Sequence, residues 1–129
     1  MLTRTRSTPP DEIILSESGA DIFVRVWRPQ APARAVLAIC HGVNSHGGQY
    51  AWVAEQMVAE GLAVYALDLR GRGRSSGERF FVEKIDDYVA DLHAMIQTLD
   101  KRVRDAERTA SGGDQSPTRE DEIPPHNAF

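Results

Sequence analysis

Two continuous apolar runs set the strongest limit on how this chain can fold. They are AVLAIC (35–40) and LAVYALD (62–68). Strands buried on both faces have this composition, as in a parallel sheet that is covered by helices. The segment between them, QYAWVAEQMVAEG (49–61), repeats apolar residues at helical spacing and ends on Gly61, where a C-terminal cap is expected. Strand, helix and strand together predict a right-handed βαβ unit.

The segments on either side of this unit extend the predicted sheet and add a helix. EIILSE (12–17) and DIFVRVWR (21–28) are short β-rich runs joined by a connection that contains glycine, which predicts an antiparallel hairpin. After the second apolar run, one helical stripe is formed by Ile85, Val89, Leu92, Ile96, Leu99 and Val103. We expect a loose leader over 1–11, one folded region over 12–104, and a disordered or unrelated tail over 105–129.

Composition and charge exclude several classes of protein. A net charge of −4 over 129 residues gives no strong field for nucleic acid or anionic lipid. The single cysteine, Cys40, excludes an intrachain disulfide framework and is expected to be a small buried side chain. No apolar run approaches the roughly 20 residues that cross a membrane, and no secretory apolar region follows the N-terminal arginines. A soluble, cytoplasmic protein is expected.

The stretch LDLRGRGRSSGERF (67–80) contains a formal match to G-x-S-x-G at Gly73, Ser75 and Gly77. That pattern marks a serine nucleophile only where a strand runs directly into the first glycine and small residues follow the last. Here Arg70, Gly71 and Arg72 intervene, and bulky residues follow. The stretch also lacks the lysine and spacing of a phosphate loop and the length of an arginine-glycine RNA-binding tract. We interpret it as a tight loop whose glycines supply positive φ.

Three motifs in order resemble the N-terminal part of the α/β-hydrolases. They are CHGVNSHGGQY, VYALDLRGRGRSSG and ERFFVEKIDDYVADL, and the resemblance runs from about residue 12 to about residue 104. It is nearest to monoacylglycerol lipases, lysophospholipases and serine-aminopeptidase-like hydrolases. The resemblance implies an α/β fold: the N-terminal portion of an α/β-hydrolase, with an antiparallel hairpin plus a βαβ unit, ending before the strand that carries the nucleophile.

The same resemblance implies roles for individual residues. His41 and Gly42 match the His-Gly pair that follows the third strand, so the Val43 N–H is the candidate oxyanion donor, and these three residues form the substrate loop. Gly42 also allows close approach of backbone to substrate. The implied structural loop contains Asp68, Arg70, Gly71, Gly73, Ser75 and Gly77. His46 and Tyr50 match a further H-x-x-x-Y of the family, whereas Arg72 stands where histidine is common. Neither a metal nor a cofactor is implied.

The family's nucleophile motif, G-H-S-x-G-G, does not occur in the 129 residues, and no catalytic acid or histidine can be assigned. His93 falls in the middle of a predicted helix, and His126 lies in the polar tail. The family's reaction is carboxylic-ester hydrolysis of an acyl-ester lipid, and we expect this chain to be inactive in it.

The alternative is a non-enzymatic interaction module or a truncated gene product. In the family's strand order, the neighbour of the strand at 35–40 is the nucleophile strand. We therefore expect self-association through residues 35–40, because an unpaired apolar edge is a template for another strand.

Overall fold

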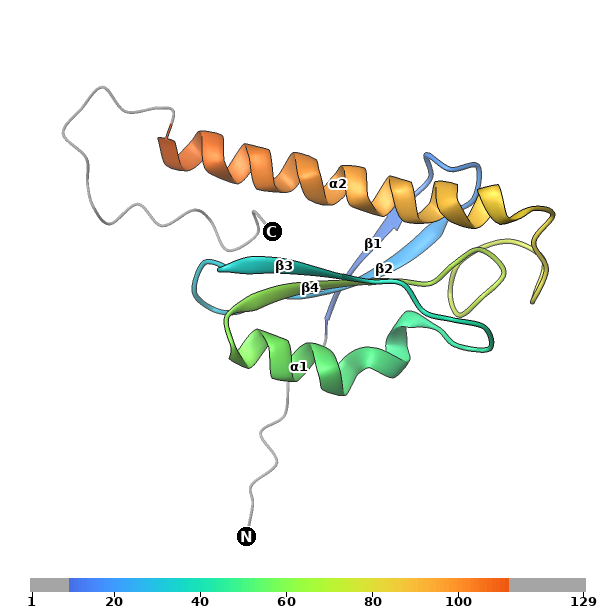
Figure 1. Cartoon of the computed structure of the whole chain (residues 1–129), viewed down its shortest axis with the longest axis horizontal. Helices are drawn as coiled ribbons and strands as arrows, with labels where there is room; N and C mark the ends of the chain where they lie inside the picture. Colours follow the sequence, from blue (N-terminus) through green and yellow to red (C-terminus); the bar gives the residue numbers. More distant parts are fainter. Residues whose placement is uncertain (1–9, 112–129) are drawn as a thin grey trace, which may run out of the picture.

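The computed structural model describes residues 10–111 as one mixed sheet with a helix on each face (Figure 1). The strands are β1 (Asp11–Leu15), β2 (Ile22–Trp27), β3 (Ala35–Ile39) and β4 (Leu62–Leu67). A 3-10 turn, η1 (Gly47–Tyr50), leads into helix α1 (Ala51–Ala59), and helix α2 (Ile85–Ser111) follows the loop after β4. The predicted hairpin and βαβ unit are both present, so the α/β fold class is confirmed.

The strand order in the sheet is β1-β2-β4-β3. β1 pairs antiparallel with β2, and β2 pairs antiparallel with β4. β3 pairs parallel with β4, with Leu37 opposite Val64. Within the described residues, β3 is therefore an outer strand of the sheet, paired on one side only.

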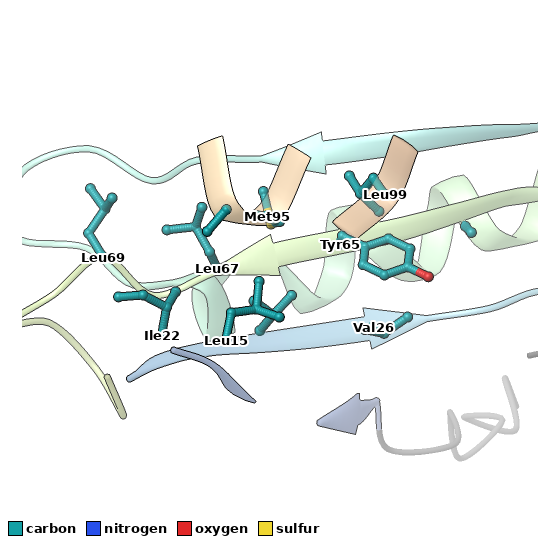
Figure 2. Packing of buried hydrophobic residues seen from close by; sticks show 11 residues of the cluster. Leu15, Ile22, Val26, Tyr65, Leu67, Leu69, Met95 and Leu99 are labelled. Atoms are coloured by element: carbon teal, nitrogen blue, oxygen red, sulfur yellow. The ribbon is translucent and has the colours of Figure 1, made fainter. Parts of the chain in front are cut away.

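The apolar run in β4 is continuous because both faces of this strand are buried. Alternate residues Ala63, Tyr65 and Leu67 belong to the core cluster beneath α2, which includes Met95 and Leu99 (Figure 2). The residues between them, Val64 and Ala66, belong to a second cluster with Ala54 of α1. Because successive side chains of a strand point to opposite faces of the sheet, this one apolar run contributes residues to both clusters.

Helix α1 starts and ends at recognisable signals. Ahead of it, the His46 side chain accepts a hydrogen bond from the Gly48 N–H at 3.1 Å and caps the 3-10 turn. Behind it, Gly61 has a φ of +88°, the left-handed conformation expected of a glycine cap. The predicted helix over 49–61 is therefore shorter in the structure, because its first residues form the 3-10 turn.

Helix α2 is longer than expected, and this corrects the predicted tail. The helix runs through Ser111, so residues 105–111 are helical and not disordered. Ala106 is buried, and the ion pairs Arg104–Asp100 and Lys101–Asp105 join helix positions four apart. Such pairs and the good helix formers in DAERTA stabilise the added turns. The rest of the tail, 112–129, lies outside the described residues, as do residues 1–9 of the leader that was predicted over 1–11. Asp11, the last residue of that predicted leader, is the first residue of β1.

Candidate functional site

The two loops that contain the predicted site residues begin where the parallel strands end. Residues 40–50 follow β3, and residues 68–84 follow β4. The carboxyl ends of neighbouring parallel strands meet at one edge of a sheet, where open α/β sheets bind ligands. The structure therefore brings the predicted substrate loop and the predicted structural loop together.

His41 is buried and joins these two loops. Its Nε2 accepts a hydrogen bond from the Leu69 N–H at 2.9 Å, and its Nδ1 lies 2.9 Å from the Gly42 carbonyl oxygen. A backbone N–H can only donate, so Nε2 carries no proton and the neutral ring holds its proton on Nδ1. The Nδ1–H then donates to Gly42, and both ring nitrogens are engaged. His41 therefore holds the loop in place, and neither of its ring nitrogens is free to act as a base.

The contact from His41 fixes the peptide unit between Gly42 and Val43. In a trans peptide the C=O and the N–H point in opposite directions, and the described residues contain no cis bond. Because the Gly42 carbonyl is held by His41, the Val43 N–H must point away from that ring. Among the residues that the structure describes, none accepts a hydrogen bond from this N–H. A fixed and unpaired donor of this kind can bind a developing negative charge.

A cavity of about 340 Å³ opens beside this peptide unit. One wall is the loop after β3, and the other is the first half of α2. The lining is mostly apolar and consists of Cys40, His41, Gly42, Val43, Leu69, Arg72, Ile85, Tyr88, Val89 and Leu92. An apolar hollow beside an unpaired backbone donor suits a ligand with a hydrocarbon part and a carbonyl group.

Asp68 is fully buried and ties the two loops to β2. Its Oδ1 accepts hydrogen bonds from the Gly47 N–H at 2.6 Å and from Arg25 Nη1 at 2.8 Å. Its Oδ2 accepts from the Arg74 N–H at 2.9 Å. Gly73, at a φ of +47°, passes so close that an added Cβ would lie 2.3 Å from Oδ2. The predicted loop glycine is therefore required here by both its backbone angle and the lack of space.

Ser75 is buried, and both hydrogen-bonding functions of its hydroxyl are used. Oγ accepts from the Phe23 N–H at 2.9 Å and donates to the Asp68 carbonyl oxygen. A nucleophilic serine needs an exposed Oγ that a base can deprotonate. The geometry at Ser75 instead joins the loop after β4 to β2. Gly71 and Gly77 also adopt positive φ in this loop, which completes the compact turn.

Arg70 anchors the same loop to α2 and to the hairpin. Its guanidinium forms an ion pair with buried Asp91 at 2.7 Å, and it donates to the Ser18 carbonyl oxygen at 2.8 Å. Ser18 Oγ donates to Asp91 as well. The hydrogen bond to Asp91 raises the pKa of Arg70, so the guanidinium stays charged throughout the working range of a protein.

Two features of the site were not predicted from the sequence: the cavity wall contributed by α2, and the partner of Asp68. Ile85, Val89 and Leu92 belong to the helical stripe predicted over Ile85 to Val103, but no part in a cavity was predicted for them. Arg25 gave a weaker signal, as a single charge within the apolar run of β2. Arg72, where the resemblance departs from the family, lines the cavity with its guanidinium 4.9 Å from the centre of the Phe80 ring.

In the described part of the chain, no three His, Cys, Asp or Glu side chains gather as they would around a metal ion. No helix among residues 10–111 is both long and apolar enough to cross a membrane.

Cys40 stands at the end of β3, on the cavity wall, and is exposed at the surface rather than fully buried as expected. Partial burial of the thiol raises the pKa of Cys40, and the Asp91 charge raises it further. A raised pKa leaves less thiolate at neutral pH, and thiolate is the reactive form.

We therefore expect iodoacetamide to label Cys40 slowly at neutral pH. The labelling rate should increase with pH, and the midpoint of that increase should lie at a higher pH than for an exposed cysteine in a short peptide. An inflection at or below that of the peptide would contradict the assigned environment.

Comparison with known proteins identifies the family. The family model described as serine aminopeptidase, S33, matches residues 31–113, which is more than half of the chain. The chain belongs to this α/β-hydrolase family. The matched residues include both loops of the site and the whole of α2.

Several relatives are lipases by name. A monoacylglycerol lipase of Mycolicibacterium smegmatis is 36% identical over 96 residues, which are 74% of this chain and 33% of that protein. The human monoglyceride lipase is 30% identical over 88 residues, 68% of this chain and 29% of that protein. A crystal structure of a soluble variant of the Saccharomyces cerevisiae monoglyceride lipase, with a substrate analogue, shares the fold. It has a TM-score of 0.64 and 20% identity over 72% of this chain and 32% of that chain. The chain thus spans about a third of the length of these relatives.

Proposed function

We propose that this chain supplies the oxyanion-hole segment of a carboxylic-ester hydrolase of the monoacylglycerol lipase or lysophospholipase type. The observation that carries the proposal is the Gly42–Val43 peptide, held by His41 so that the Val43 N–H is unpaired beside an apolar cavity. When an ester is attacked, its carbonyl oxygen becomes an oxyanion, and a preorganised N–H stabilises that charge. The apolar lining would hold the acyl chain, and the family relatives named as lipases support an acyl-ester lipid as substrate.

Residues 1–129 alone are proposed to be inactive in this reaction. Ser75 is buried with its hydroxyl engaged, and both nitrogens of His41 are engaged. Cys40 is held in its thiol form by a raised pKa. Without a nucleophile and a base, the tetrahedral intermediate that an oxyanion donor stabilises does not form. We place the chain in the cytoplasm, where a single thiol of this kind would stay reduced.

A chimera tests whether the segment works as proposed. The segment of the Mycolicibacterium smegmatis monoacylglycerol lipase that aligns with this chain is replaced by the matching residues of this chain. We expect the chimera to hydrolyse a monoacylglycerol with a kcat within about tenfold of the parent, a difference of roughly 1.4 kcal/mol in barrier. This chain alone should neither hydrolyse nitrophenyl esters nor react with a fluorophosphonate probe.

Two results would count against the proposal. The first is a chimera that melts like the parent lipase but has no activity. The second is covalent labelling of Ser75 in this chain, which would show that the loop assignment is wrong.

A second candidate function is non-enzymatic association through residues 35–40. The observation that favours it is that β3 is paired on one side only within the described sheet. Sedimentation of the purified chain tests self-association, because a cooperatively folding monomer at high concentration would exclude it.

A further inference from the structure

The loop between β4 and α2 contains the arginines Arg70, Arg72, Arg74 and Arg79, and three of the four have partners that explain their positions. Arg70 and Arg74 form ion pairs with acidic side chains. Arg79 donates to carbonyl oxygens of the same loop. Arg72 differs from them, because its Nη1 is buried and has no hydrogen-bond partner among residues 10–111. A buried donor that is left unpaired on a permanently charged group lowers stability, so this side chain calls for another explanation.

Arg72 also lines the cavity of about 340 Å³ beside the Gly42–Val43 peptide. Among the described residues that line this cavity, none is Asp or Glu, so no carboxylate of the lining balances the charge of Arg72. Most of the lining is apolar, and a charge in apolar surroundings is poorly solvated. A guanidinium in this position favours an anion that enters the cavity together with an apolar group.

Turning the Arg72 guanidinium toward such an anion gives up little. Its Cζ lies 4.9 Å from the centre of the Phe80 ring, which is a cation–π contact. Phe80 is 70% exposed, and contacts of this kind are weak where solvent reaches them. Nη1 loses no hydrogen bond when the guanidinium turns, because it has none within the described part of the chain. A phosphate or carboxylate offers a pair of acceptor oxygens, which match the planar donors of a guanidinium.

We propose that Arg72 is an anion-binding residue of this cavity, and that the cavity binds a single-chain lipid with a phosphate or carboxylate group. The apolar lining holds the hydrocarbon chain, and Arg72 pairs with the anion. The identity of the lipid rests on the proposed function: a phosphate belongs to the alcohol part of an acyl-ester substrate, and a carboxylate belongs to the fatty acid that hydrolysis releases. Arg72 stands where the family often has histidine, so this preference is a property of this chain.

Calorimetric titration of the purified 129-residue chain tests the proposal with three ligands. Decyl phosphate and decanoate carry the two anions, and monodecanoylglycerol is the neutral counterpart; all are used below their micelle concentrations. We expect at least one anion to bind about tenfold more tightly than the neutral ligand, as one charge-assisted hydrogen bond would give. Added salt should reduce this difference. Tighter binding of decyl phosphate indicates a phosphate on the substrate, and tighter binding of decanoate indicates the product.

Variants of Arg72 locate the anion site. Arg72→Gln should weaken binding of the preferred anion about tenfold and leave the affinity for monodecanoylglycerol nearly unchanged. Arg72→Lys keeps the charge but not the planar donors, so it should retain part of the preference. Because Nη1 has no hydrogen bond to lose, both variants should melt like the original chain.

Arg104→Gln is the matched control. Arg104 is an exposed arginine of α2 that pairs with Asp100 at 3.1 Å, and it does not line the cavity. The substitution removes the same charge outside the cavity and should leave all three affinities unchanged.

Three results would overturn the inference. They are equal affinity of the original chain for neutral and anionic ligands, an anion preference that survives Arg72→Gln, and an equal loss of neutral and anionic binding in that variant. None of these measurements uses hydrolysis. A lipase chimera without esterase activity would contradict the proposed function and leave the anion preference standing. A chain without the preference would contradict this inference and leave the activity of the chimera unaffected.

Discussion

Val43→Pro in the lipase chimera should lower kcat for monoacylglycerol hydrolysis by about 10²–10³-fold, the range for loss of one oxyanion donor. Proline has no backbone N–H, so the substitution removes the donor, and the other residues that line the cavity are unchanged. The donor acts mainly in the transition state, so KM should change much less than kcat. Steady-state kinetics on the purified chimera measures both.

Val43→Ala is the matched control for this experiment. Alanine keeps the N–H, and the Val43 side chain is 83% exposed, so little packing is lost. We expect near-normal kcat for Val43→Ala, and a similar melting temperature for both variants. Full activity in a folded Val43→Pro chimera would show that this N–H is not the donor.

Asp68→Ala should destabilise the purified chain by about 3–5 kcal/mol, the usual cost of removing one member of a buried ion pair. The substitution leaves the Arg25 guanidinium and the N–H groups of Gly47 and Arg74 without their acceptor. Marginal stabilities of about 5–15 kcal/mol are common, so a large part of the folding free energy would be lost. Urea unfolding followed by circular dichroism measures the change.

Glu12→Ala gives the comparison for Asp68→Ala. It breaks the Arg74–Glu12 ion pair, whose two side chains are both well exposed to solvent. Exposed pairs contribute about 0–1 kcal/mol, so the free energy of unfolding should change little. An equally small effect for Asp68→Ala would mean that the loops do not depend on this carboxylate.

The strands and helices were predictable because their patterns are local. The continuous apolar run at 62–68 indicates a strand with both faces buried, and this inference does not require knowing which strands or helices lie beside it. Gly61 likewise predicted the end of α1, because helices commonly end at a residue with positive φ, which glycine adopts without strain. The end of α2 was not predicted, because residues 105–111 contain no large apolar side chain and their polar composition is also typical of a disordered tail. Their spacing of opposite charges was the available signal for a helix.

The contacts that shape the site could not be predicted in the same way. The bond from Leu69 to His41 and the bond from Arg25 to Asp68 join residues 28 and 43 positions apart. Such partners depend on strand order and register, which local patterns do not contain. The resemblance pointed to His41, Gly42 and Val43, but only the structure shows how His41 orients the peptide unit between the other two.

The Asp68 junction also limits how this site can assemble during folding. Its carboxylate accepts hydrogen bonds from Arg25 of β2, from Gly47 in the segment after β3 and from Arg74 in the loop after β4. Each of these contacts closes a loop in the chain. Closing loops costs entropy before the contacts can offset it, so such junctions form late compared with a hairpin or a helix. A partly folded form that lacks the β2–β4 pairing would therefore lack the bond from Arg25 to Asp68, one of the contacts that hold the two loops of the candidate site. Slow or incomplete sheet assembly would leave a chain with its helices formed but without the candidate site.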